Sequence, residues 1–402
     1  MTDRMERRPS FLRLDLHYIA MQCGFWAMFG AICAYQAALL FARGFTNSEV
    51  GLVISVRCLT GIVAQPLLGL FADRHPSLPL KWVMTASLLL SLAAALPLTL
   101  LPLNFLGSVI VFAVIGAFET SAYPLIDSMA IQYINDGIPL HYSLGRGIGS
   151  LAYAICCALL GVLTAQFGIE SVLPVHTGLI VVEILLVSTF PTHRGTTTHA
   201  EHTGTPQSPV ALLKTHPRFS LSLMASLFCV TGIIPLSNFL VNMTDHLGGD
   251  SQSLGLALFL MGAFELPSAF LFPKLKRRLG TSGLFTFSLF FCAAKCAAFA
   301  LAPSITLLLC AQSLQMLGYG LFAPTSVFLV NENVSPADRV QGQTLMMVAS
   351  NGLGGVLGSA IIGRALDFGV TFALILCTLF CLVGGVLALF AQRLPKETTK
   401  EV

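Results

Sequence analysis

Long apolar stretches, separated by short polar turns, fill most of the chain. They show no strand-like alternation, and each is long enough to cross a bilayer, which takes about 20 residues per helix. We expect these helices at residues 16–42, 48–71, 80–103, 105–133, 141–165, 169–190, 216–243, 250–275, 281–301, 303–330, 339–366 and 368–392. The pattern predicts an all-α membrane protein with twelve transmembrane helices.

The longest polar gap, residues 191–215, divides these helices into two sets of six. It is rich in Thr, His, Pro and Gly and cannot bury an apolar face, so we expect a flexible linker there. The two sets also repeat each other weakly, with basic turns at corresponding places after the second and eighth helices. We predict an N-terminal six-helix bundle in 1–190, a cytoplasmic linker in 191–215 and a C-terminal six-helix bundle in 216–402.

The composition agrees with a membrane protein. Charged residues make up 10% of the chain and hydrophobic residues 55%, and the mean hydropathy is +0.80. A soluble chain has about 25% charged residues, so a soluble protein is excluded.

The basic residues predict the orientation in the membrane. On one side the loops hold only Arg43 and Arg364, whereas most other Lys and Arg residues fall on the opposite side. Because loops rich in Lys and Arg stay in the cytoplasm, we expect both termini there, in a multi-pass protein of the inner (plasma) membrane. The basic start at 1–13 leads into a full-length span rather than a short signal core, so the first helix is expected to stay.

Neither a metal site, a cofactor nor an enzyme is predicted. The 11 cysteines lie in apolar segments without a Cys-x-x-Cys pair, so we expect small core residues. Cys292 and Cys296 share a helix face, but no His or carboxylate accompanies them. His193, His199 and His202 lie in the linker, where we expect them to be solvated. Hydrolase motifs such as His-Glu-x-x-His and Gly-x-Ser-x-Gly are absent from the sequence.

Two carboxylates and an arginine interrupt the apolar sequence between residues 119 and 153. Glu119, Tyr123 and Asp127 are spaced by four and form one polar stripe on a helix. Arg146 and Tyr153 are spaced by seven and share a face of the next helix. An ionised side chain inside a membrane is costly and usually marks a substrate or ion path, so we expect a binding site here. The alternative is that Asp127 and Arg146 lie at helix ends and only anchor a cytoplasmic turn.

Three further ionisable side chains, Arg57, Glu265 and Lys295, fall within predicted helices. Burial favours a neutral carboxylate and a nearby cation favours a charged one, so such a carboxylate can bind and release a proton. We expect Asp127 and Glu265 to be the titrating groups. Lys295 is expected to face Glu265 or the substrate, and Arg57 to form part of the same set of charges.

The twelve helices, the central linker and the turn Gly69-Leu-Phe-Ala-Asp73-Arg74 resemble the major facilitator superfamily of transporters. The signature of that superfamily after its second helix is Gly-x-x-x-Asp-Arg/Lys-x-Gly-Arg/Lys-Arg/Lys. His75 and Pro76 stand where further Gly and basic residues are expected. The resemblance implies two pseudo-symmetric bundles that rock about a central site. It also implies that Gly69, Asp73 and Arg74 form a gating loop, which holds the bundles less tightly than the full signature would.

Within the superfamily, most of the chain resembles the oligosaccharide:proton symporter group, of the lactose permease and phenylpropionate permease types. Pro124-x-x-Asp127 stands where lactose permease has Pro-x-x-Glu, and Gly145-Arg146 stands where it has a helix-five arginine. The resemblance implies that Asp127 and Arg146 hold sugar hydroxyls and that Tyr153 stacks on the sugar ring.

The C-terminal half departs from that pattern. Lys295 replaces the helix-nine arginine, so the positive charge lacks the bidentate fork of a guanidinium. The helix-ten segment carries Gln312, Gln315 and Gly318 where lactose permease has Lys, His and a proton-binding Glu. Glu265 resembles the helix-eight acid of the phenylpropionate type. The resemblance implies that Gln312 and Gln315 contact the substrate.

We therefore expect a secondary active transporter that imports a small polar solute, a sugar or related polyol, together with protons. A nucleoside fits Asp127, Arg146 and Tyr153 as well, whereas Arg57 and Lys295 would suit the carboxylate of an aromatic acid. An uncoupled facilitator is a further alternative, because the helix-ten acid is absent. The expected partners are the solute, protons and the lipid bilayer, without nucleic acid, and the protein is expected to be a monomer.

Overall fold

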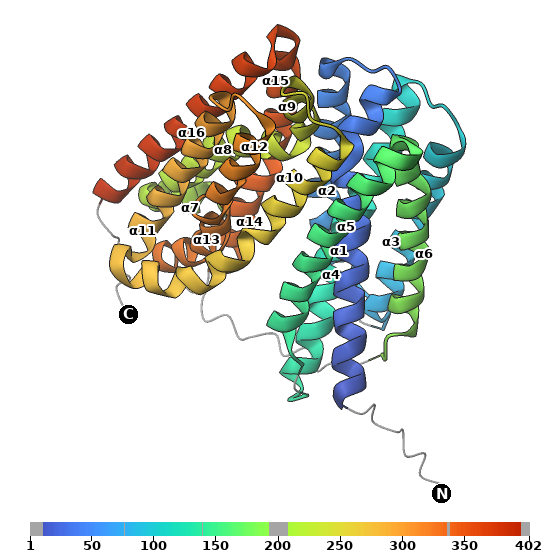
Figure 1. The fold of residues 1–402 in the computed structure, drawn as a ribbon. Helices are drawn as coiled ribbons and strands as arrows, with labels where there is room; N and C mark the ends of the chain where they lie inside the picture. The colour runs from blue at the N-terminus through green and yellow to red at the C-terminus, as the bar shows by residue number, and fades with distance from the viewer. Residues whose placement is uncertain (1–10, 76, 139, 193–207, 336–337, 395–402) are drawn as a thin grey trace, which may run out of the picture.

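The computed structural model describes residues 11–75, 77–138, 140–192, 208–335 and 338–394. Within these ranges the chain folds into helices without strands (Figure 1). Pro76, in the predicted gating loop, and the predicted solvated histidines His193, His199 and His202 lie outside the described residues.

The N-terminal bundle contains six membrane-spanning helical segments, in agreement with the sequence pattern. α2 starts with a capping box, in which the Glu49 backbone N–H donates to Thr46 Oγ1 and the Glu49 carboxylate accepts from the Thr46 backbone N–H. The elements are α1 (Phe11–Ala42), α2 (Asn47–Arg74), α3 (Leu80–Leu100), α4 (Phe105–Asn135), α5 (Tyr142–Phe167), η1 (Ile169–Ser171) and α6 (Val172–Thr189).

The C-terminal bundle has more interrupted helices. Part of the predicted linker forms the short helix α7 (Pro209–Thr215), which Ser208 caps and Pro209 begins. The remaining elements are α8 (Pro217–Asn238), α9 (Leu240–His246), α10 (Ser251–Ala263), α11 (Glu265–Ala300), α12 (Ile305–Ala311), η2 (Gln312–Met316), α13 (Tyr319–Asn333), α14 (Arg339–Met347), η4 (Val348–Gly354), α15 (Gly355–Ala365), η5 (Leu366–Phe368) and α16 (Val370–Arg393).

One helical stretch contains two of the predicted spans. The described residues hold 11 stretches long and apolar enough to cross a membrane, and Ser251–Ala300 is 50 residues long. A straight helix of that length would extend about 75 Å, more than twice the thickness of a hydrocarbon core. Gly280 interrupts it with φ 69°, a conformation that a residue with a Cβ rarely adopts, so the chain reverses there. This division gives the twelve predicted crossings.

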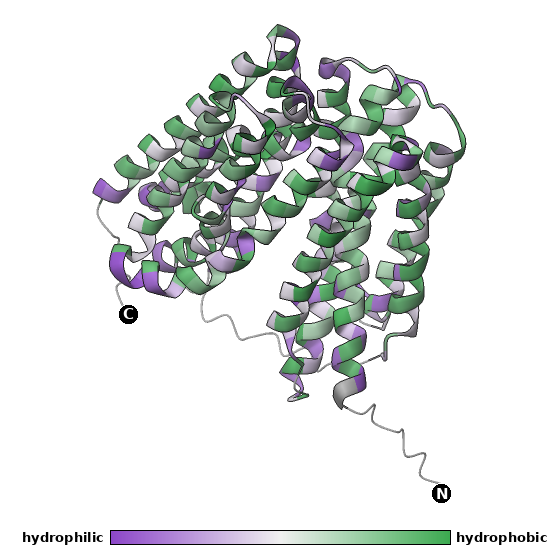
Figure 2. Cartoon of the chain, in the orientation of Figure 1, coloured by the Kyte–Doolittle hydropathy of each residue, from purple (hydrophilic) through white to green (hydrophobic). Residues whose placement is uncertain are grey.

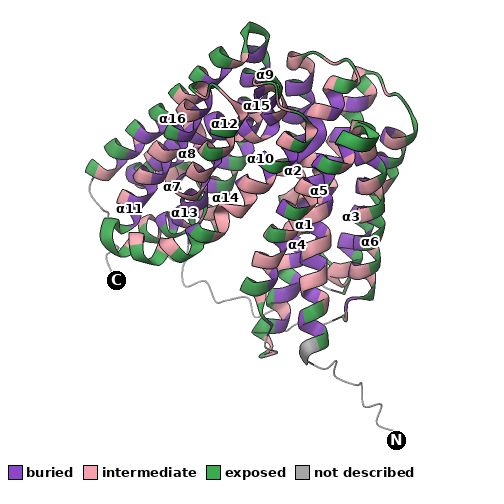
Figure 3. Ribbon diagram, in the orientation of Figure 1, coloured by how far each residue is buried: buried purple, intermediate pink, exposed green. Residues whose placement is uncertain are grey.

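The outer faces of the helices are apolar. Exposed side chains include Phe270 and Leu301, which are 86% and 81% exposed. Figure 2 shows hydrophobic residues along the spans and hydrophilic ones mainly at helix ends, and Figure 3 shows exposed residues on the outward faces. An apolar surface of this extent is suited to lipid rather than water.

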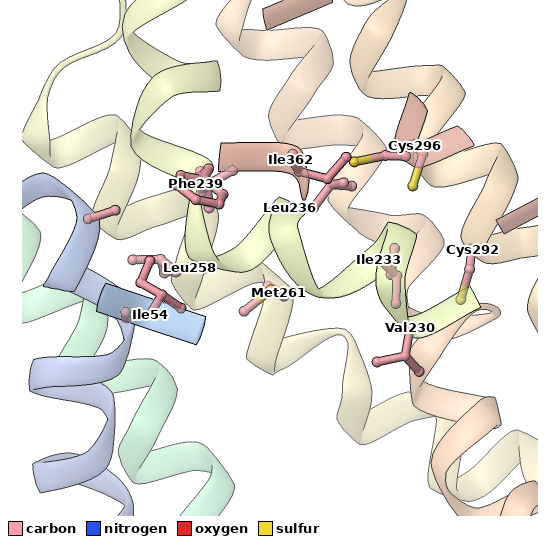
Figure 4. Packing of buried hydrophobic residues seen from close by; sticks show 14 of the residues in the cluster. Ile54, Val230, Ile233, Leu236, Phe239, Leu258, Met261, Cys292, Cys296 and Ile362 are labelled. Carbon is pink, nitrogen blue, oxygen red and sulfur yellow. The ribbon is translucent and has the colours of Figure 1, made fainter. Parts of the chain in front are cut away.

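One cluster of buried hydrophobic residues spans both bundles, and a second lies within the N-terminal bundle. Figure 4 shows Ile54 of α2 near Leu258 of α10, and both belong to a cluster that also includes Phe239 and Ile362. This cluster therefore continues from one bundle into the other.

Glycines bring the bundles into backbone contact. A Cβ built on Gly161 of α5 would lie 2.7 Å from the Gly255 Cα of α10, and one on Gly51 of α2 would lie 2.6 Å from the Ser359 carbonyl oxygen of α15. Both contacts lie near the turns that include Gly168 and residues 366–369. We call this the closed end, and we call the opposite end, where α1 begins and α16 ends, the terminal end.

Hydrogen bonds add to the contact at the closed end. Ser48 Oγ donates to Asp367 Oδ2 at 2.5 Å, and Asn242 Nδ2 donates to Asn47 Oδ1 at 2.9 Å. Along α2, further contacts reach Ile62, which lies against Gly352, whereas a Cβ on Gly69 would have no atom within 4 Å. The ribbons of the two bundles accordingly diverge toward the terminal end (Figure 1).

We predict that Gly161→Val separates the bundles at the closed end. The atom nearest to the new Cβ is in the backbone of Gly255, so a side-chain rotation cannot relieve the clash. Spin labels at Ser171 and Thr371, in a background without native cysteines, should report a longer distance. The matched control is Gly178→Val, because a Cβ there meets no atom within 4 Å. An unchanged distance in Gly161→Val would contradict the role of this contact.

Candidate substrate site

Arg146 lies between two aromatic rings. Its guanidinium carbon is 4.3 Å from the centroid of Trp26 on α1 and 4.5 Å from that of Tyr123 on α4. A guanidinium over an aromatic face is stabilised by the ring quadrupole, more strongly away from water. Arg146 Nη1 is buried without a hydrogen-bond partner in the described part of the chain. The side chain thus keeps an unused donor within an aromatic clamp.

Glycines on α5 make room for this clamp. A Cβ on Gly145 would lie 2.5 Å from the ring of Tyr18, and one on Gly149 would lie 2.6 Å from the ring of Trp26. Gly147, between them, would meet no atom within 4 Å. Since residues four apart share a helix face, Gly145 and Gly149 form a groove for the aromatic side chains of α1.

Asp127 of α4 accepts a hydrogen bond from α1 and lies among aromatic side chains. Gln22 Nε2 donates to its Oδ1 at 3.2 Å, and the side chains of Tyr123 and Tyr142 lie near the same carboxylate. Gln22 in turn accepts from Trp26 Nε1 at 3.1 Å. Asp127 and Arg146 are therefore held by the same aromatic groups, Tyr123 above all, rather than by a direct salt bridge.

Tyr153 lies where α5 meets the C-terminal bundle. Its ring packs on Gly30 of α1, and a Cβ on Gly262 of α10 would lie 3.6 Å from it. Its ring centroid is 6.4 Å from that of Trp26. Tyr153 thus joins the aromatic clamp to the start of α11, where Glu265 stands.

In the C-terminal bundle, an amide connects a cation and a carboxylate. Lys295 Nζ donates to Gln315 Oε1 at 2.7 Å, and Gln315 Nε2 donates to Glu265 Oε1 at 2.8 Å. Lys295 and Gln315 are buried, whereas Glu265 is partly exposed. Lys295 was expected to face Glu265 or the substrate, and the two side chains are linked through Gln315.

Irregular helices surround this chain of hydrogen bonds. Gln312 and Gln315 lie in the 3₁₀ segment η2, and Tyr319 follows it and donates to Asn351 of the π-helical segment η4 at 3.1 Å. Gln312 is buried, but its Oε1 has no partner among the described residues. Non-α turns in transporter helices commonly mark sites where polar backbone and side chains face a ligand.

Two predicted residues lie apart from this cluster. Glu119 is fully buried and bonds to His176 and Ser91. Arg57 of α2 is also buried, and its Nη1 donates to Cys33 Sγ at 3.2 Å and to Gln36 Oε1 at 3.4 Å. Both therefore lie inside the N-terminal bundle.

The predicted gating loop lies at the terminal end. Asp73 and Arg74 are exposed and form no hydrogen bond or ion pair with any residue that the structure describes. Their role in gating stays a prediction.

Five cysteines of the C-terminal bundle are buried, namely Cys229, Cys292, Cys296, Cys377 and Cys381, whereas Cys310 is exposed. Cys296 Sγ lies 3.8 Å from Cys381 Sγ, and Cys381 Sγ donates to the Cys229 carbonyl oxygen at 3.3 Å. Among the described residues, no three His, Cys, Asp or Glu side chains are placed to hold a metal ion. The buried cysteines pack as small core residues.

Sequence reasoning missed Gln22, Trp26 and Tyr319. Gln22 and Trp26 are four residues apart on the first span, the same spacing that revealed Glu119, Tyr123 and Asp127. That spacing could have identified α1 as a third helix of the site, beside α4 and α5. Tyr319 gave no such signal, because it stands alone at a helix interruption.

The sequence and the fold identify the family. Residues 12–376 match the MFS_1 like family, so the chain belongs to this family. No match was found among curated proteins.

The fold is similar to those of several solved transporters. The nucleoside transporter NupG, as a point mutant, superposes with a TM-score of 0.81 at 17% identity, over 94% of this chain and 99% of that one. A bacterial homolog of the human lysosomal transporter Spinster, inward-facing and unoccupied, gives a TM-score of 0.72 at 13% identity, over 96% and 98% of the two chains. An auto-inhibited POT family peptide transporter gives 0.68 at 14% identity, over 98% and 99%. The protein therefore has the major facilitator fold.

We predict that Gln315→Leu destabilises the protein because it leaves Lys295 buried without its acceptor. An unsatisfied buried polar group costs about 1–3 kcal/mol, more when charged. The purified variant should unfold at a lower temperature in detergent. Gln312→Leu is the matched control, because the Gln312 carbonyl oxygen already lacks a partner. Equal losses of stability in both variants would show that the link to Lys295 contributes nothing.

Proposed function

We propose that the protein is a secondary active transporter that imports a small neutral solute with a hydroxyl-bearing ring, together with protons. The observation that carries the proposal is the balance of charge in the candidate site. Asp127 and Glu265 supply two negative charges, and Arg146 and Lys295 supply two positive charges, when each has its ordinary charge. The sum is zero, so a neutral solute adds no uncompensated charge to a site within the membrane.

The aromatic side chains support a solute with a ring. Trp26 and Tyr123 lie against Arg146, and Tyr153 lies beside Trp26, so flat apolar faces and polar groups occur together. A carboxylate accepts from hydroxyls and a guanidinium donates to them, while an aromatic ring covers the apolar face of a sugar. Sugars and nucleosides both present this combination.

An aromatic acid is less well supported. That alternative depended on Arg57 and Lys295 pairing with a substrate carboxylate. Arg57 is buried beside Cys33 and Gln36, and Lys295 already donates to Gln315. An anionic solute would have to displace these contacts.

A nucleoside is the second candidate. The observation that favours it is the overall similarity to the nucleoside transporter NupG, with TM-scores of 0.81 and 0.79 for two structures. The identity is 17%, so this similarity shows the fold and does not determine the specificity. A nucleoside would place its ribose hydroxyls at Asp127 and its base against an aromatic ring.

Proton coupling is supported by ionisable groups at the interface of the bundles. Glu265 and Asp127 are partly exposed in a membrane protein whose bundles diverge at the terminal end. The distribution of Lys and Arg predicts that this end faces the cytoplasm. An uncoupled facilitator would carry the same solutes but would not accumulate them.

The test is uptake into proteoliposomes of radiolabelled uridine, adenosine, glucose and lactose, with and without an inward proton gradient. Accumulation of at least one above the external concentration is expected. Ligand-induced thermal stabilisation of the purified protein would identify the same solute, because a ligand stabilises the state that it binds. Uptake of aromatic acids alone, or reduced retention of lipophilic dyes, would overturn the proposal.

We predict that Asp127→Asn and Arg146→Lys abolish transport and weaken binding of that solute while membrane expression is kept. Tyr153→Phe should be tolerated better than Tyr153→Ala, because stacking requires the ring and not the hydroxyl. The measurement is solute affinity of the purified variants. Arg43→Lys, at an ion pair with Glu170 remote from the site, is the matched control for Arg146→Lys. Normal affinity in Asp127→Asn and Arg146→Lys would move the site elsewhere.

A further inference from the structure

A second polar cluster lies inside the N-terminal bundle, away from Asp127 and Arg146. Glu119 of α4 and His176 of α6 are both 0% exposed, and His176 Nε2 lies 2.9 Å from Glu119 Oε1. Ser91 of α3 donates to the same oxygen at 2.7 Å. An acid and a base, fully buried together within a membrane, are costly to maintain for stability alone.

The hydrogen bonds determine which histidine nitrogen is free. An ionised carboxylate only accepts hydrogen bonds, so Nε2 of a neutral His176 carries the proton that it donates to Glu119. His176 Nδ1 then has a lone pair, and it is buried without a partner among the described residues. The ring can therefore take up one more proton at Nδ1, and Glu119 neutralises the imidazolium that results.

A second cation approaches the same carboxylate. Gly116 stands one turn before Glu119, and a Cβ there would lie 2.8 Å from Arg57 Cγ, so the absence of a side chain lets Arg57 pack closely against α4. Arg57 lies within electrostatic range of Glu119, and its Nε and Nη2 are buried without hydrogen-bond partners in the described part of the chain. Arg57 and a protonated His176 thus compete for one negative charge.

Two helices connect this cluster to the candidate substrate site. α4 carries Glu119 and, eight residues or about 12 Å further along its axis, Asp127, with Pro124 between them. α1 carries Trp26 at the site and Cys33 beside Arg57. Because a proline removes a helix hydrogen bond and permits bending, movement of α4 at the solute can change the distance between Arg57 and Glu119.

We propose that Glu119 and His176, and not Asp127 and Glu265 as expected from the sequence, bind the transported proton, at His176 Nδ1, inside the N-terminal bundle and apart from the residues that contact the solute. The proton is taken up when Arg57 is held away from Glu119, and it is released when Arg57 moves closer and satisfies that charge. The groups that face Glu119 are Ser91 of α3, Arg57 of α2 and His176 of α6. This inference rests on the proposed function for its coupling to solute, but not for the protonation itself.

The first experiment measures protonation without any solute. Solid-state ¹⁵N NMR of histidine-labelled protein in liposomes, compared with His176→Gln to assign the signal, should show Nδ1 of His176 unprotonated at high pH. As the pH falls, that signal should shift to the protonated position, and in Glu119→Gln the shift should be lost over the same range. An Nδ1 signal that is protonated at every pH, or that titrates identically in Glu119→Gln, would overturn the proposal.

The second experiment separates proton coupling from solute movement. Uridine, adenosine, glucose and lactose are the probes, in proteoliposomes that contain a pH-sensitive dye. His176→Gln keeps the hydrogen bond to Glu119 but lacks the basic nitrogen, so exchange of solute should continue while accumulation and proton influx are lost. The matched control is Glu183→Gln, which removes another fully buried carboxylate of α6 and should leave coupling intact.

The outcomes distinguish the two proposals. Absence of solute exchange by the unaltered protein would count against the proposed function, while the NMR result still decides the protonation of His176. Normal accumulation and proton influx in His176→Gln would overturn the coupling role. Loss of coupling in Glu183→Gln with retention in His176→Gln would place the proton site at Glu183 instead.

Discussion

The cost of charge inside a bilayer governs this structure. Every ionised side chain within the bundles must have a compensating group nearby, because lipid offers none. Arg146 is compensated by two aromatic faces and Lys295 by the oxygen of Gln315. The positions of the cations therefore explain why the aromatic and amide side chains stand where they do.

The hydrophobic pattern alone was sufficient to predict the fold, because the thickness of the bilayer fixes the length of a membrane-spanning helix. The boundary at Gly280 could also be predicted, since the chain must reverse there to keep each crossing at bilayer thickness. The predicted domain limits, with the linker at 191–215, stay predictions. The fold class thus follows from the length and spacing of the apolar stretches along the sequence.

The candidate site was only partly predictable. Spacing placed Asp127 and Tyr123 on one face of α4, and they do lie together, with Tyr123 also against Arg146. The same spacing grouped Glu119 with them, but a helix of this length passes through two environments, and Glu119 meets α3 and α6 instead. Which partner a side chain finds depends on helix packing, and a pattern along one helix does not contain that information.

The backbone contact of Gly161 with Gly255 has a mechanical consequence. Dispersion attraction between close-packed atoms falls steeply, and a gap of about 0.5–1 Å already removes a quarter to a half of it. Long side chains could change rotamer and keep contact while the helices move apart, whereas two glycine backbones in contact cannot adjust in this way. The closed end is therefore expected to be either fully packed or fully separated, so that intermediate openings of the bundles are sparsely populated.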